Sequence, residues 1–162
     1  MGKHKNVLTY SIWIILALTA FSVGIWFSND QPYDFKTLDG TRYKHSDIQG
    51  DIIVVNYFAQ WCAPCLREIP ELNEFYHQAA DKVKLFGVSF DNLTEEQLVQ
   101  LRAKYNIEFP LISIIKTDFA FDKPQYLPAT FIIAPSGELA MQLFGEQTSA
   151  TLTQSISALK TK

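Results

Sequence analysis

The sequence has few of the residues that build metal centres or several disulfides. Its 162 residues include two cysteines, two methionines and three histidines. A structural zinc site takes four protein ligands. Besides the two cysteines, the candidate ligands are His45 and His77, because His4 precedes the uncharged run described below. These two histidines form no second paired motif. There is also no Met-rich or His-rich tract. We therefore expect neither a metal ion nor another cofactor.

The chain also lacks an excess of positive charge. Its 14 basic residues stand against 17 acidic ones, which gives a net charge of −3. Nucleic acids and anionic lipid headgroups attract basic surfaces. The charge balance therefore predicts no nucleic-acid partner and no tight docking to anionic headgroups.

Charge is missing altogether from the run between Val7 and Phe27. About 20 apolar residues are enough to cross a bilayer as a helix. Lys3 and Lys5 precede this run, and the first charges after it are acidic. Because basic flanks tend to stay in the cytoplasm, we expect everything after Phe27 to be exported.

These observations predict four regions in the chain. Residues 1–6 form a cytoplasmic N-terminus, residues 7–27 a transmembrane signal anchor, residues 28–32 a linker and residues 33–162 an exported domain. A cleaved signal peptide is the alternative, with small residues between Ala20 and Gly24 as possible cleavage positions.

The exported part has the pattern of an α/β domain. Asp39-Gly40 predicts the turn of a hairpin over residues 33–43. Apolar runs and helical periodicity then predict strands over 52–59, 83–90, 129–134 and 138–144, and helices over 66–79, 94–105 and 149–160. Pro70 is expected to kink the first of these helices. The order β-α-β-α-β-β-α predicts a sheet with helices packed on it.

The two cysteines lie in "WCAPC", where the first buried strand gives way to a helix. A thiol at a helix N-terminus faces unpaired N–H groups and the positive end of the dipole, which favour the thiolate. We therefore expect Cys62 to be the exposed nucleophile of low pKa and Cys65 the buried resolving thiol. Pro64 is suited to the first helical turn. An inert structural disulfide is the alternative, although so short a loop makes a weak crosslink.

The segments "NYFAQWCAPC" and "LPATFIIAPSGEL" resemble the thioredoxin-fold superfamily, and most closely its membrane-anchored TlpA/ResA/CcmG members. The resemblance implies a central mixed sheet with flanking helices and an N-terminal β-hairpin. It implies a cis-proline at Pro128 and a substrate-pairing backbone at Leu127. Glu68 matches the acid of the W-C-x-x-C-x-x-E-x-P pattern and is expected to exchange protons with the thiols. Trp61 matches the indole that flanks the site and contacts substrate.

The chain also departs from these relatives. The buried aspartate of cytosolic thioredoxin is Asn56 here, which moves the expected proton transfer to Glu68. The Ala-Pro dipeptide between the cysteines lacks the histidine of DsbA-type oxidants, which favours a reductant. The stretch "DKPQYLPATF" differs from the Gly-x-Tyr-Gly-x-Pro-Glu-Thr of CcmG proteins.

The resemblance implies a membrane-tethered thiol–disulfide oxidoreductase that reduces exported proteins, with apocytochrome c as a candidate substrate. It also implies a membrane electron donor of the CcdA/DsbD type. The expected location is the bacterial inner membrane, crossed once by residues 7–27, with the C-terminal domain in the periplasm or outside the cell membrane. Two alternatives are a copper-handling module like the Sco proteins, and a disulfide oxidase or isomerase on the same fold.

Overall fold

The computed structural model describes residues 13–19 and 32–160. The chain divides into two units, Met1–Pro32 and Tyr33–Lys162. In the first unit residues 13–19 are helical, and the rest of the predicted anchor over 7–27 lies outside the described residues. No helix among the residues described is both long and apolar enough to cross a membrane.

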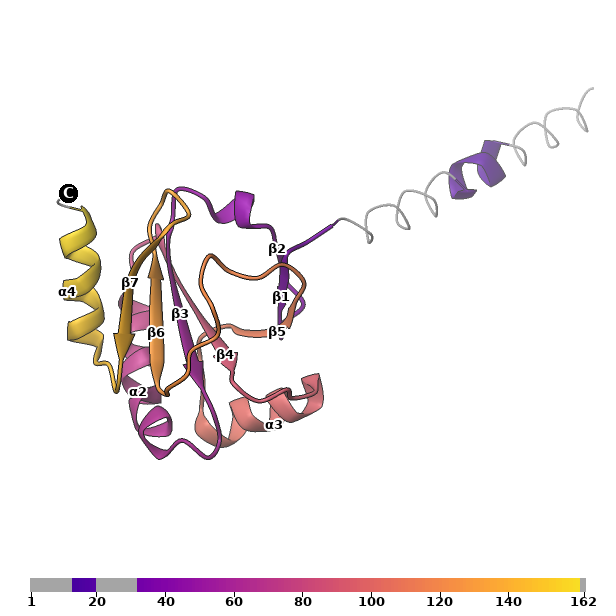
Figure 1. The fold of residues 1–162 in the computed structure, drawn as a ribbon. Coiled ribbons are helices and arrows are strands. Elements are labelled where there is room, and N and C mark those ends of the chain that lie inside the picture. The colour runs from indigo at the N-terminus through magenta and orange to yellow at the C-terminus, as the bar shows by residue number, and fades with distance from the viewer. Residues whose placement is uncertain (1–12, 20–31, 161–162) are drawn as a thin grey trace, which may run out of the picture. The chain divides into compact units, whose positions relative to one another are not determined.

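The second unit is built on a seven-stranded mixed sheet in the order β2-β1-β5-β4-β3-β6-β7 (Figure 1). Its strands are β1 (Phe35–Thr37), β2 (Arg42–Tyr43), β3 (Ile52–Phe58), β4 (Val83–Ser89), β5 (Leu111–Ile115), β6 (Ala129–Ile133) and β7 (Leu139–Phe144). Every residue of β3 is buried, which explains its nearly continuous apolar sequence. β3 is parallel to β4 and antiparallel to β6.

Three α-helices and one short 3-10 helix accompany the sheet. They are η1 (His45–Ile48), α2 (Ala63–Gln78), α3 (Glu95–Tyr105) and α4 (Ser149–Lys160). α2 runs through Pro70. Thr94 begins α3 in a capping box with Gln97, and Asn106 ends it in the left-handed conformation. At both ends of α3, nearby residues therefore form hydrogen bonds with backbone groups that a helix terminus leaves unpaired.

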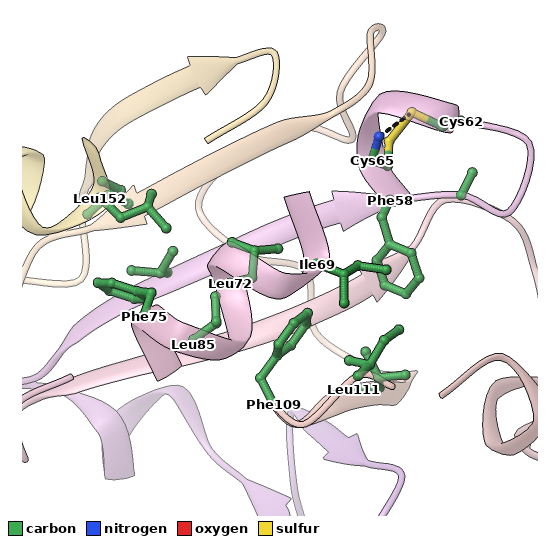
Figure 2. Close-up of a cluster of buried hydrophobic side chains, with 14 of the residues drawn as sticks. Phe58, Cys62, Cys65, Ile69, Leu72, Phe75, Leu85, Phe109, Leu111 and Leu152 are labelled. Atoms are coloured by element: carbon green, nitrogen blue, oxygen red, sulfur yellow. Dashed lines mark hydrogen bonds between the residues drawn. A yellow bond between two sulfur atoms is a disulfide. The ribbon is translucent and has the colours of Figure 1, made fainter. Parts of the chain in front are cut away.

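The helices cover one face of the sheet. Val54 and Phe58 of β3 point to this face and join a cluster with residues of α2, α3 and α4. Figure 2 shows Ile69 and Leu72 of α2 against this cluster, with the cysteine pair at its end next to Phe58. Both cysteines therefore belong to the buried cluster between the sheet and the helices.

The other face of the sheet is covered by η1 and by a covering loop, residues 116–127. Phe119 of this loop packs on Phe35, with ring centroids 5.4 Å apart. Phe121 stacks on Phe131 of β6 at 3.9 Å. Aromatic contacts thus replace a helix on this face, and in Figure 1 the covering loop crosses in front of the strands.

The predicted α/β architecture is confirmed, with two additions. The apolar run 109–115, for which no strand is predicted, contains β5, and β5 joins β4 to the hairpin strand β1. Gly87 of β4 allows this close packing, because a Cβ atom there would lie 2.7 Å from side-chain atoms of both Leu111 and Phe109. The short helix η1 also has no counterpart among the predicted elements.

Candidate active site

The cysteine pair lies where the chain passes from β3 into α2, with Cys65 in the first turn of the helix. Cys62 is the N-cap of α2, and its Sγ accepts the backbone N–H of Cys65 at 3.3 Å. The two sulfurs form a disulfide, with the Cα atoms 5.3 Å apart. A sulfur that receives a helix N-terminal N–H is stabilised as a thiolate once the disulfide is reduced.

The disulfide form buries both cysteines. Cys62 is 5% exposed and Cys65 is 0% exposed. The order of accessibility follows the sequence analysis, but Cys62 offers much less surface than the expected exposed nucleophile. The surrounding chain therefore leaves little of Cys62 accessible in the disulfide form.

The register between β3 and β6 places Pro128 at the same end of the sheet as the cysteine pair. Tyr57 pairs with Ala129 in this antiparallel ladder, so Pro128 lies opposite the end of β3. That end of β3 precedes Cys62 by a few residues in the sequence. The peptide bond between Leu127 and Pro128 is cis. The backbone N–H and C=O of Leu127 have no hydrogen-bond partner in residues 32–160. These free groups are the kind that bind an extended peptide.

Glu68 is a buried acid one helical turn after Cys65. Its side chain is 1% exposed, and residues three apart share a helix face. Its Oε1 accepts the Asn56 side-chain N–H at 2.8 Å, and its Oε2 accepts the backbone N–H of Gln147 at 2.9 Å. Burial raises the pKa of Glu68 to about 7, although both hydrogen bonds act in the opposite direction. This carboxyl group is therefore able to gain or lose a proton near neutral pH.

The segment before α4 and the first residue of α4 are attached to α2 at three points. Arg67 and Glu146 form an ion pair, Glu68 accepts from Gln147, and Glu71 accepts the backbone N–H of Ser149 at 3.0 Å. The same segment follows Gly145, whose N–H donates to the carbonyl of Pro128 at 2.9 Å. Glu68, which lies on the helix that carries Cys65, is thus hydrogen-bonded to the loop next to the cis-proline.

Trp61 is held at the rim of the site. Its indole N–H donates to both carboxylate oxygens of Asp91, at 3.1 and 3.2 Å, and its ring meets Phe90 edge to face at 6.1 Å. The side chain is still 65% exposed. The contact between Trp61 and Asp91 spans 30 residues, and no local sequence pattern connects them.

An aromatic surface that the sequence analysis missed lies on the other side of Pro128. Tyr126 and Phe144 are 72% and 55% exposed, and their rings meet edge to face at 6.5 Å. They line a cavity of about 390 Å³ between the covering loop and β7. Exposed aromatic residues that gather beside a site are typical of binding surfaces. We call Tyr126 and Phe144 the aromatic pair.

The two histidines of this unit interact with residues other than the cysteines. His77 pairs with Glu108, and the His45 ring lies 3.3 Å from the carbonyl oxygen of Thr117. Within the described residues, the structure brings together no group of three or more His, Cys, Asp or Glu side chains suited to a metal. Neither histidine thus joins the cysteine pair.

The domain thus combines a disulfide at a helix start, a buried acid and a cis-proline. The family model described as "AhpC/TSA family" matches residues 29–142. The chain belongs to the AhpC/TSA family. Among its curated relatives is the thiol-disulfide oxidoreductase ResA of Bacillus cereus, 27% identical, with 91% of this chain and 94% of that protein covered. The thioredoxin-like protein YneN of Bacillus subtilis is 27% identical over 83% of this chain and 81% of its own length.

Solved structures show the same fold. StoA of Bacillus subtilis has a TM-score of 0.62 and 22% identity, covering 76% of this chain and 95% of its own. A putative thiol:disulfide interchange protein DsbE from Chlorobium tepidum has a TM-score of 0.61 and 22% identity, covering 77% and 90%. This AhpC/TSA-family chain thus has a thioredoxin-like fold and is a thiol–disulfide oxidoreductase related to ResA, with a disulfide between Cys62 and Cys65.

Proposed function

We propose that the protein works as a reductant of disulfides in exported proteins, tethered to the bacterial inner membrane by residues 7–27. The direction of electron flow rests on the Ala63-Pro64 dipeptide, which lacks the histidine of DsbA-type oxidants. The proton transfer rests on Glu68, an acid buried one turn from Cys65. A reductant must remove a proton from its buried resolving thiol during each turnover, and Glu68 is the acid best placed to accept it. The names of the ResA and DsbE relatives support the same chemistry.

The reaction proceeds in two exchange steps. The Cys62 thiolate attacks one sulfur of the substrate disulfide, a mixed disulfide forms, and the other substrate sulfur leaves as a thiolate. The Cys65 thiol then gives its proton to the Glu68 carboxylate, and the Cys65 thiolate attacks the Cys62 sulfur. The second substrate thiolate leaves, so two electrons have passed to the substrate. The proton on Glu68 passes to solvent or to a leaving thiolate.

The substrate is an extended polypeptide segment that carries the disulfide. Its backbone pairs with the free N–H and C=O of Leu127 beside Pro128. Trp61 on one side and the aromatic pair on the other contact apolar side chains near the substrate cysteine. These contacts suit unfolded or partly folded chains, and apocytochrome c before haem attachment is the candidate client.

After each turnover the Cys62–Cys65 disulfide has to be reduced again. An exported protein has no access to cytosolic thiols, so the electrons must cross the membrane. A membrane donor of the CcdA/DsbD type supplies them in this proposal. The anchor would keep the domain close to that donor.

The decisive measurement is the reduction potential of the purified protein in glutathione buffers. A reductant is expected to lie well below the potential of about −120 mV that is typical of DsbA. A value close to that of DsbA would overturn the proposed direction and favour an oxidase. Cys62→Ser must abolish catalytic reduction of a model disulfide, and activity that survives this change would overturn the mechanism.

The location and client are tested separately in cells. Alkaline phosphatase fused after residue 162 is expected to be active, because that enzyme needs the oxidising side of the membrane. A strain that lacks the protein should lose covalently bound haem c, with rescue by the wild type and not by Cys62→Ser. Normal haem c in that strain would remove apocytochrome c as the client.

A further inference from the structure

Asn56 lies at the centre of the hydrogen bonds around Glu68. It is 0% exposed and belongs to β3. Its side-chain Nδ2 donates one hydrogen to Glu68 Oε1 at 2.8 Å and the other to Thr130 Oγ1 at 3.1 Å. Its Oδ1 is buried and has no hydrogen-bond partner in the described part of the chain. Such an unpaired buried oxygen needs an explanation.

The side chains of Glu68 and Thr130 can also form hydrogen bonds with the other end of the Asn56 amide. A Thr hydroxyl both donates and accepts, and a carboxyl group accepts when ionised and donates when protonated. If the amide turns by half a rotation, Oδ1 can accept from the Thr130 hydroxyl and from a protonated Glu68. The terminal torsion of Asn is broad and two-fold, and oxygen and NH₂ occupy similar space. Each orientation leaves one end of the amide unpaired.

We propose that Asn56 is a positioning residue for the dithiol reaction, and that its side-chain amide turns over to hold the Glu68 carboxyl group in both of its protonation states. Nδ2 faces the carboxylate before proton transfer, and Oδ1 faces the carboxylic acid afterwards. This inference rests on the proposed use of Glu68 as the acceptor of the Cys65 proton. It explains why an acceptor is left unpaired in a buried site where Nδ2 uses both of its hydrogens.

Other residue types at position 56 would bias the proton. An aspartate would place two carboxyl groups within hydrogen-bonding distance, and such a pair shares one proton and titrates in two separated steps. A leucine would remove the donor and leave the Glu68 carboxylate with the Gln147 N–H alone. An amide keeps a single titrating acid at this place and also keeps a hydrogen bond to it.

The groups that face Glu68 from the other elements are consistent with a single titration. β3 and β6 present the uncharged side chains of Asn56 and Thr130. The segment before α4 presents the Gln147 N–H and the carboxylate of Glu146, which is paired with Arg67. On α2 itself, one helical turn to either side of Glu68, lie Cys65 of the disulfide and Glu71, whose carboxylate accepts the Ser149 N–H.

The test follows Glu68 and Asn56 by NMR in the oxidised full-length protein in detergent, without substrate. The Glu68 carboxyl carbon is assigned with Glu68→Gln and titrated between pH 5 and pH 9. In the wild type, both Asn56 side-chain N–H signals should move to positions typical of unbonded amides as Glu68 gains its proton, with the same midpoint. If these signals stay at hydrogen-bonded positions while Glu68 titrates, the amide does not turn and the proposal is wrong.

Two variants add an independent check. Asn56→Asp should split the single titration into two coupled steps, and Asn56→Leu should move the Glu68 midpoint upward by about one pH unit or more. Glu71→Gln is the matched control, because it removes a carboxylate bonded to the same segment and should leave the midpoint unchanged. Wild-type titration in both Asn56 variants would overturn the proposal. If Asn56→Leu does not fold, the isosteric Asn56→Asp and the wild-type signals still decide.

This experiment separates the role of Asn56 from the function proposed above. The titration is measured in the disulfide form and involves neither a client nor an electron donor. A reduction potential typical of an oxidase would overturn the reductant proposal while the coupled titration of Asn56 and Glu68 stood. The opposite result would leave the reductase without this positioning residue.

Discussion

Glu68 should make the stability of the oxidised protein depend on pH in a direction opposite to that of an ordinary carboxylate. Its pKa rises from an ordinary value of 4.5 to about 7 on folding, with burial as the main cause. Between these two values the folded protein binds more protons than the unfolded chain. The free energy of unfolding therefore falls as the pH rises through this window. The Glu68 contribution is fully favourable below pH 4.5 and is lost above pH 7.

The magnitude follows from the size of the shift. One pKa unit corresponds to about 1.4 kcal/mol, so the Glu68 term changes by about 3 kcal/mol across the window. Because the side chain is 1% exposed, solvent screening reduces this figure little. Glu68→Gln removes the titration and keeps the shape of the side chain. The variant should therefore gain about 3 kcal/mol relative to the wild type as the pH rises from about 4.5 to 8.5.

Urea unfolding of the oxidised full-length protein in detergent, at several pH values, measures this difference. Comparing each variant with the wild type at the same pH cancels the exposed acids that titrate in both proteins. Glu71→Gln, which changes the same charge on the next turn of α2, should stay within about 0.5 kcal/mol of a constant difference. A Glu68→Gln difference that is flat across the range would refute a raised pKa for the buried acid.

Three further predictions concern the cysteines, the aromatic pair and the sheet. Cys65→Ser should accumulate a mixed disulfide between Cys62 and its client, which is visible on non-reducing gels. The Cys62→Ser control should form no such species. A catalytically active Cys65→Ser would contradict the resolving role. Replacing Tyr126 and Phe144 by serine should raise KM for a polypeptide disulfide about tenfold and leave the reduction of a small disulfide unchanged; equal losses with both substrates would show that the aromatic pair supports the fold instead. Gly87→Ala should lower the free energy of unfolding by about 1–3 kcal/mol, because its Cβ would lie 2.7 Å from two side chains; an unchanged urea midpoint would show that those side chains yield without cost.

Much of the fold followed from local sequence patterns. The buried strand before the cysteines, the capping box at Thr94 and the turn at Gly40 depend on residues a few positions apart, and the structure contains all three. β5 was missed because its apolar run is followed by the irregular covering loop, and because its identity depends on pairing with β1 and β4. Such pairing is a long-range property that periodicity does not reveal.

The site shows the same division between local and long-range information. The sequence by itself determined the cysteine spacing, the place of Cys62 at a helix start and the motif around Pro128, since each is a short pattern with local physical meaning. Only the tertiary structure decided that Glu68 is buried between Asn56 and Gln147, because desolvation comes from elements 12 and 79 residues away. The same holds for the aromatic pair, which only the antiparallel register of β6 and β7 brings beside the cis-proline. The short motif places the two thiols, but burial raises the pKa of Glu68 and so controls where the proton resides. Burial is a property of the whole fold.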